Sequence, residues 1–167
     1  MKIIKELIPY VVIILVVVVI RTFLITPVIV SGSSMRPTLE NNEILLLNKF
    51  DKSYERFDIV VIDFDNGTYK EKLIKRIIGL PGEQIEYNDG RLYVNGKVLE
   101  DKFSTNTHDF TTQKIGSIKI PKDSYLVLGD NRNNSIDSRM IGFISKDDIE
   151  GITNIKLFPI NEFGKIK

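Results

Sequence analysis

The sequence predicts a mostly β fold, an antiparallel and hairpin-rich sheet domain preceded by one N-terminal transmembrane helix. An aliphatic run fills most of the first 25 residues, and short aliphatic segments of strand length recur beyond Pro37. Two turn signals, NDG and NG, separate three of these segments. Because no strand–helix–strand alternation is present, a parallel α/β sheet is disfavoured. We expect an amino-terminal tail over residues 1–6, an anchor over 7–25 and a β-rich domain over 26–167.

The predicted anchor is nearly continuous over residues 7–20, is interrupted at Arg21 and resumes as far as Ile25. At 1.5 Å per residue the first part spans about 21 Å. The run through Ile25 spans about 28 Å, close to the roughly 30 Å of a bilayer's hydrocarbon core. We therefore expect a helix that crosses the membrane, with the Arg21 side chain reaching the interface and Pro27 ending the helix.

The charges around this run predict its orientation. Lys2 and Lys5 precede it, so the amino terminus should stay cytoplasmic, with the rest of the chain on the extracytoplasmic side of the cell membrane. A cleaved secretory signal is the alternative, because Ser31-Gly32-Ser33 fits a small-x-small cut site. The apolar run is longer than the roughly 7–15 residues usual in such a signal, which favours an uncleaved, single-pass anchor.

The aliphatic segments after Pro37 predict the strands of the domain. Asn88-Asp89-Gly90 reads as the turn of a hairpin, and residues 145–148 (SKDD) as one capped helical turn. Residues 103–117 lack a periodic pattern and are predicted to be an irregular surface excursion. The predicted strands are Ile44–Leu47, Asp58–Phe64, Lys72–Gly79, Gln84–Tyr87, Arg91–Val94, Lys97–Leu99, Tyr125–Leu128 and Ile152–Phe158.

Composition excludes several classes of function. The 167 residues carry a net charge of +1 without a basic stripe, which gives no reason to expect a nucleic-acid partner. The chain has no cysteine, so disulfide frameworks and thiolate metal sites are excluded. Its single histidine, His108, excludes a three-histidine zinc site within one chain.

The stretch VSGSSMRPTLENNEILL, residues 30–46, contains the first candidate for chemistry. Gly32 relaxes the backbone before Ser34, and Pro37 favours an extended conformation just before it. A sharp turn of this kind can present the Ser34 hydroxyl and aim backbone N–H groups at a developing oxyanion. An ordinary polar loop is the alternative interpretation.

The second candidate is the pair Lys75-Arg76 in the predicted strand at residues 72–79. Alternation sends these two side chains to opposite faces, each between aliphatic neighbours. A lysine held among apolar groups loses hydration, its pKa falls, and it can then serve as a base, whereas a guanidinium stays charged. The spacing does not say which cation points inward, and both would reach solvent if this strand lay at a sheet edge.

The third candidate is the polar loop GDNRNNSIDSR, residues 129–139, directly after the aliphatic segment YLVL. Asp137 and Arg139 could pair, and the Ser135 hydroxyl could donate to or accept from a neighbouring group. A solvated turn and a calcium loop are alternatives. The calcium loop is disfavoured because the twelfth position counted from Asp130 is Ile141, where an EF-hand has Glu.

A triad of Ser34, His108 and an aspartate is arithmetically possible, but His108 lies in the irregular excursion, where no rigid scaffold is predicted. Neither GxSxG nor SxxK is present. The residues by themselves therefore offer a hydroxyl nucleophile and a lysine without a convincing histidine base.

Four segments, SGSSMRPTL, FDIVVI, KRIIGLPGEQI and GDNRNNSIDSR, resemble in order the motif boxes of bacterial type I signal peptidases, and the single predicted anchor resembles their Gram-positive type. The resemblance implies a membrane-bound serine endopeptidase with the β fold shared by signal peptidases and SOS repressors. Its implied substrates are secretory preproteins with small side chains at the first and third positions before the cut, and its surroundings are membrane lipid. It implies no need for a metal or an organic cofactor.

The same resemblance implies roles for individual residues. Ser34 matches the nucleophile and Lys75 the general base of a Ser-Lys dyad. Ser135 matches a serine that orients the lysine, and Asp137 and Arg139 match a supporting pair. One departure is that Gly32 stands where some members have a Ser or Thr whose hydroxyl helps to hold the oxyanion, which leaves the second oxyanion donor open.

Two other functions remain open from the sequence. The same dyad could serve a peptidase dedicated to one protein, or self-cleavage as in the SOS repressors, although those carry a DNA-binding domain where this chain has its predicted anchor. The chain could also be a catalytically silent membrane-bound binding module, which the joint presence of Ser34, Lys75 and Ser135 disfavours.

Overall fold

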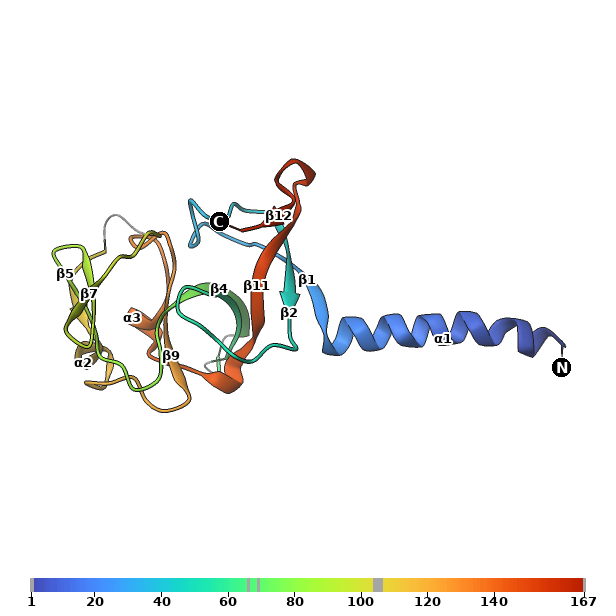
Figure 1. Ribbon diagram of the computed structural model, residues 1–167, viewed down its shortest axis with the longest axis horizontal. Coiled ribbons are helices and arrows are strands. Elements are labelled where there is room, and N and C mark those ends of the chain that lie inside the picture. The colour runs from blue at the N-terminus through green and yellow to red at the C-terminus, as the bar shows by residue number, and fades with distance from the viewer. Residues whose placement is uncertain (1, 66, 69, 104–106, 167) are drawn as a thin grey trace.

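In the computed structural model, a long N-terminal helix, α1 (Lys2–Phe23), projects away from a body made of β-strands (Figure 1). The structure describes residues 2–65, 67, 68, 70–103 and 107–166, apart from the side chains of residues 2–5 and 19–23. The strands that follow α1 directly lie at its carboxyl-terminal end, and β5 and β7 lie on the far side of the body. The domain is therefore reached from α1 through β1.

The larger sheet has the strand order β1-β2-β11-β3-β4-β9-β10, with β12 added beside β11. All its strand pairs are antiparallel, as predicted. The small sheet has the order β7-β6-β5-β8 and is antiparallel as well. The strands are β1 Ile25–Ile29, β2 Ile44–Asn48, β3 Ile59–Asp65, β4 Lys70–Gly79, β5 Ile85–Asn88, β6 Arg91–Val94, β7 Lys97–Leu99, β8 Phe110–Thr111, β9 Ser124–Leu128, β10 Ile144–Ser145, β11 Ile149–Phe158 and β12 Gly164–Lys165.

The prediction of a mostly β, hairpin-rich domain is confirmed. The turn between β5 and β6 has Asp89 and Gly90 at φ values of 50° and 70°, the left-handed region that a two-residue hairpin turn requires. Asn95 and Gly96 repeat this arrangement between β6 and β7. The predicted helical turn at SKDD is the 3-10 helix η1 (Lys146–Asp148), in which the Ser145 hydroxyl accepts from the Asp147 N–H.

The prediction of an irregular excursion over residues 103–117 is wrong for part of that segment. Phe110–Thr111 forms β8, which pairs with β5, and Thr112–Ile115 forms the short helix α2. The physical reason is burial, because the Phe110 ring stacks on Tyr87 with centroids 5.2 Å apart. Residues 104–106 of the segment lie outside the described residues. Two more short helices are α3 (Ser138–Ile141) and the 3-10 helix η2 (Ile160–Glu162).

The amino-terminal run is helical as predicted, but α1 ends at Phe23, before the predicted boundary at Ile25. Pro27 does not end the helix; it lies within β1, whose place at the sheet edge tolerates a residue without an N–H. None of the described helices combines the length and the apolar character that a membrane span requires. The predicted roles of Lys2, Lys5 and Arg21 concern side chains outside the described ones.

Strand β4 lies between β3 and β9, so the alternative that it is an edge strand with two solvated cations is wrong. Strand β4 pairs with its two neighbours over different lengths. The β3 side is paired from Lys70 to Arg76, whereas the β9 side is paired only from Arg76 to Gly79. Among the described strands, the amino-terminal half of β4 thus keeps one edge without a ladder, as does β1, which pairs with β2 alone.

Candidate active site

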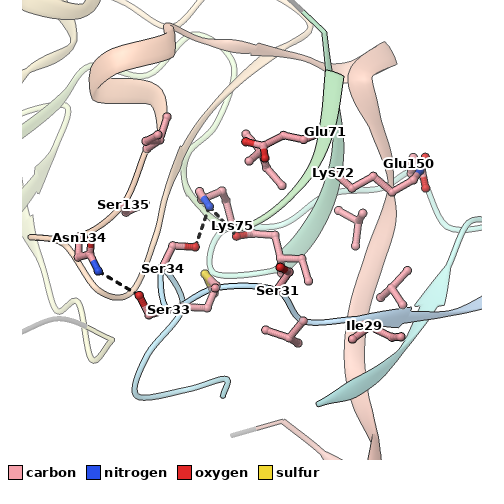
Figure 2. A pocket seen from close by; sticks show the side chains of 18 of the residues that line it. Ile29, Ser31, Ser33, Ser34, Glu71, Lys72, Lys75, Asn134, Ser135 and Glu150 are labelled. Atoms are coloured by element: carbon pink, nitrogen blue, oxygen red, sulfur yellow. Dashed lines mark hydrogen bonds and ion pairs between the residues drawn. The ribbon is translucent and has the colours of Figure 1, made fainter. Parts of the chain in front are cut away.

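Ser34 and Lys75 meet at the base of a groove. The Lys75 Nζ lies 2.9 Å from the Ser34 Oγ and donates to the Ile74 carbonyl at 3.0 Å. Figure 2 shows the two side chains pointing toward each other, Ser34 from the turn after β1 and Lys75 from β4. Lys75 is only 3% exposed, so this contact is largely shielded from bulk water.

The turn that carries Ser34 is held in place by its neighbours. Met35 and Leu39 are fully buried in a small core with Val30, so the chain is anchored on both sides of Ser34. The N–H of Gly32 donates to the Asn41 side chain at 2.9 Å. Gly32 has a φ of +90°, which a residue with a Cβ rarely adopts. The predicted sharp turn is therefore present, and Gly32 makes its backbone course possible.

The loop after β9 packs directly on this turn. The Asn131 N–H donates to the Ser34 carbonyl at 2.9 Å, and the Asn131 Nδ2 donates to the Ser33 carbonyl at 3.1 Å. A Cβ added at Gly129 would lie 2.5 Å from the Ser34 carbonyl oxygen, so the loop can approach this closely only with glycine there. The Asn134 Nδ2 also donates to the Ser33 hydroxyl at 3.0 Å.

Burial sets the protonation of Lys75. Desolvation in the groove lowers the pKa of Lys75 from its ordinary value, while the carboxylates of Asp137 and Glu71 act in the opposite direction. Burial has the larger effect, so the neutral amine is favoured relative to a lysine in water. A neutral amine 2.9 Å from a hydroxyl can accept its proton.

Arg76 points to the opposite face of β4, where it is buried and fully paired. Its guanidinium binds both carboxylate oxygens of Asp130, at 2.8 and 2.6 Å, and lies under the Phe103 ring, 3.5 Å from the centroid. The Thr38 hydroxyl donates to the same carboxylate at 2.6 Å. This ion pair therefore ties β4, the loop after β9 and the segment that follows Ser34 to one another.

Ser135 lines the groove near Ser34 and Lys75 (Figure 2). Its Oγ is buried and makes no hydrogen bond within the described residues, so the contact with Lys75 that the resemblance implies is not made in this structure. The hydroxyl is packed against Gly129, where an added Cβ would come within 2.3 Å of it. The orienting role of Ser135 stays a prediction.

Asp137 and Arg139 form a bidentate pair, with distances of 2.8 and 2.7 Å from the guanidinium to the two carboxylate oxygens. The Asp137 side chain is fully buried and also accepts from the N–H of Gly129 at 3.1 Å. The pair thus connects α3 with the start of the loop that packs on Ser34. This geometry is compatible with the supporting role that the resemblance implies.

The groove has a volume of about 830 Å³ and is lined by both open strand edges, residues 26–30 of the β1 side and residues 71–75 of β4. Its far end carries charge, because Lys72 forms an ion pair with Glu150 (Figure 2). Ile136 and Met140 are exposed apolar side chains at its other wall. An extended peptide could therefore lie between the two edges with its backbone beside the Ser34 hydroxyl.

His108 is exposed and does not line the groove, so the structure does not bring a Ser34–His108 pair together. Within the described residues, no three His, Cys, Asp or Glu side chains are grouped so that they could hold a metal ion. The expectation that no metal or cofactor takes part stays a prediction.

The sequence interpretation assigned no role to Asp130, Thr38 or Asn131. Their contacts join distant segments: Arg76 and Asp130 lie 54 residues apart, Thr38 and Asp130 lie 92 apart, and Asn131 and Ser33 lie 98 apart. No local pattern could have indicated these contacts, although the polar density of the loop at 129–139 was a general signal that internal hydrogen bonds order it.

Comparison with known proteins gives one consistent answer. A family model described as "Signal peptidase, peptidase S26" matches residues 3–158. "Signal peptidase I P" of Bacillus subtilis subsp. natto is 44% identical over 160 residues, covering 89% of this chain and 85% of the relative. "Signal peptidase I S" of Bacillus subtilis (strain 168) is 38% identical over 158 residues, covering 87% and 84%.

A solved structure agrees with the sequence relatives. The crystal structure of a signal peptidase I from Enterococcus faecalis V583 is similar, with a TM-score of 0.55 and 36% identity. The match covers 60% of this chain and 96% of that one. Since the family model matches most of the chain and the relatives are similar over most of their length, this chain belongs to the signal peptidase family, peptidase S26, whose type I members are serine peptidases.

Proposed function

We propose that this chain is a membrane-anchored serine endopeptidase that removes N-terminal signal peptides from secretory preproteins, with Ser34 as nucleophile and Lys75 as general base. The observation that carries the proposal is the contact of 2.9 Å between the Lys75 Nζ and the Ser34 Oγ in a water-shielded site. The lowered pKa of Lys75, which burial causes, supports the same assignment.

The reaction takes two steps. The Ser34 oxygen attacks the scissile carbonyl while its proton passes to the neutral Lys75, and the resulting ammonium then protonates the departing amine as the C–N bond breaks. This leaves an acyl-enzyme at Ser34. In the second step Lys75 takes a proton from a water, the hydroxide attacks the ester carbonyl, and the proton returns to Ser34.

Supporting groups complete the mechanism. The Ser34 N–H donates to the oxyanion of each tetrahedral intermediate. Ser135, whose hydroxyl is buried beside the groove, orients the amine of Lys75. The Asp137–Arg139 pair keeps the loop that carries Ser135 in place.

The substrate lies extended in the groove and pairs through its main chain with the edges of β1 and β4. Shallow pockets beside Ser34 accept the small side chains at the first and third positions before the cut. The N-terminal apolar run forms the anchor, with residues 1–6 cytoplasmic, 7–25 in the membrane and 26–167 outside, so that the groove lies near the bilayer in which the preprotein's own apolar segment is embedded.

A preprotein series tests the activity and the cleavage motif together. In detergent, the full chain should cut a preprotein with alanine at the first and third positions before the junction, and N-terminal sequencing of the product should find that junction. Replacing either alanine by phenylalanine should lower kcat/KM by at least about 10²-fold, because a bulky ring does not fit a shallow pocket. Equal cleavage of the phenylalanine substrates would contradict the motif, and cleavage of only one preprotein in a panel would indicate a dedicated peptidase.

The pH dependence tests Lys75 as the base. Activity needs the neutral amine, so kcat/KM should fall as the pH falls through the pKa of Lys75 in the free enzyme. The carboxylate of Glu71 holds the pKa of Lys75 higher than burial alone would. Glu71→Gln should therefore move the acidic limb of the profile to lower pH, measured with a peptide substrate that has no titrating group in that range.

Glu100→Gln is the control for this experiment, because it removes the same charge from an exposed position outside the groove. Its profile should match that of the wild type. An acidic limb that does not move in Glu71→Gln would contradict the assignment of that limb to Lys75.

A further inference from the structure

The N–H that points at the oxyanion in the proposed mechanism belongs to the peptide unit between Ser33 and Ser34. A peptide unit is planar and trans, so its carbonyl and its N–H point in opposite directions. Any group that holds the Ser33 carbonyl therefore also sets the direction of the Ser34 N–H. The question is which group does so in this chain.

Asn131 holds the carbonyls on both sides of that N–H. Its side-chain amide donates to the Ser33 carbonyl at 3.1 Å, and its backbone N–H donates to the Ser34 carbonyl at 2.9 Å. The Ser33 carbonyl also accepts from the Arg36 N–H at 3.2 Å, a local turn contact. The loop after β9 is fixed by the buried ion pair of Asp130 with Arg76. Through Asn131 this loop hydrogen-bonds to the backbone on both sides of the Ser34 N–H.

We propose that Asn131 is a positioning residue that aims the Ser34 N–H at the oxyanion of the substrate. A donor on the Ser33 carbonyl also polarises that peptide unit, which makes the opposite N–H a stronger donor. The effect matters here because Gly32 has no side chain to supply a second donor. The inference rests on the proposed peptidase activity and adds a residue that touches neither the substrate nor Lys75.

Asn131→Asp tests the proposal with almost no change in shape. The carboxylate cannot donate to the Ser33 carbonyl, while the backbone contact to Ser34 is retained. We expect kcat for a peptide substrate to fall on the order of 10²-fold, the lower end of the loss when one oxyanion donor is removed, with KM changed less than about threefold. Asn131→Ala, which removes the donor without adding charge, should show the same split between kcat and KM.

A peptide aldehyde separates this role from a merely structural one. The Ser34 Oγ adds to the aldehyde carbon while its proton passes to the Lys75 amine, and the negatively charged oxygen of the adduct takes the oxyanion's place. The affinity of Asn131→Asp for the aldehyde should fall by about the same factor as kcat, because both need the aimed N–H. The matched peptide alcohol forms no adduct, so its affinity should stay within about threefold of the wild-type value. The acidic limb of the pH profile of Asn131→Ala should not move, because this variant leaves Lys75 and the charges around it unchanged.

Asn154→Asp is the matched control, because Asn154 is exposed on β11 and does not line the groove. Its kinetics should equal those of the wild type. The proposal is overturned if Asn131→Asp and Asn131→Ala keep wild-type kcat, or if aldehyde and alcohol lose affinity equally. Failure of the proposed function would look different, because then the wild type itself would not cleave in a manner that depends on Ser34.

Discussion

Ser34→Ala should lower kcat/KM for preprotein cleavage on the order of 10⁶-fold, which puts residual activity at the limit of detection. The expectation follows from the geometry, because the Ser34 Oγ is the hydroxyl that the buried Lys75 amine contacts. The measurement is product release from a preprotein in detergent, with the variant purified in the same way as the wild type.

Loss of activity in this variant must come from chemistry and not from unfolding. Ser34 is half-buried and its carbonyl, not its side chain, binds Asn131, so Ala should keep the backbone contacts of the turn. Thermal unfolding should show a melting temperature close to that of the wild type. Full activity of Ser34→Ala would refute the dyad, and a large loss in His108→Ala, which should behave as the wild type, would favour a triad instead.

Lys75→Met should lower kcat by on the order of 10⁴-fold or more, because methionine keeps most of the bulk and removes the amine that contacts the Ser34 hydroxyl and accepts its proton. Nucleophile and base act as a unit, so adding Lys75→Met to Ser34→Ala should cost little more. The decisive measurement is single-turnover cleavage of the two single variants and the double variant. A double variant far less active than either single one would contradict a shared step.

The pH dependence of the free energy of unfolding tests the burial of Lys75 independently of activity. Burial lowers the pKa of Lys75 in the folded protein, so the unfolded chain binds more protons than the folded one between the folded pKa and the ordinary value. In that pH window the free energy of unfolding should rise with pH. Methionine pays no such desolvation cost, so Lys75→Met should unfold at or above the wild-type temperature at neutral pH, and its slope against pH should be smaller.

Much of the fold could be predicted from local patterns. The aliphatic segments DIVVIDF and YLVL are strands β3 and β9 almost to the residue, because a short apolar run bounded by turn residues has few other ways to be buried. The two hairpin turns followed from Asp89-Gly90 and Asn95-Gly96, whose backbone tolerates positive φ. Turn residues and strand length are local properties, so they can be predicted from the sequence before any tertiary contact is known.

The wrong predictions for the segment that contains β8 and for Pro27 have the same cause. Strand β8 has only two residues and no sequence pattern of its own. It forms because the Phe110 ring stacks on the Tyr87 ring of β5. Pro27 reads as a helix stop, yet it lies in an edge strand whose partner begins at Ile44. In both cases the deciding contact is distant along the chain, and local propensity carries no information about it.

By itself the sequence determined that a hydroxyl on a sharp turn, a lysine in an apolar strand and a polar loop are all present, together with the strands that carry them. Alternation also determined that Lys75 and Arg76 lie on opposite faces. Only the tertiary structure decided which face each one occupies, that the Lys75 amine lies 2.9 Å from a hydroxyl 41 residues earlier, and that Asn131 grips the turn. The physical reason is that strand order and burial arise from packing between distant segments. Packing removes water from the Lys75 amine and sets its distance from the Ser34 hydroxyl.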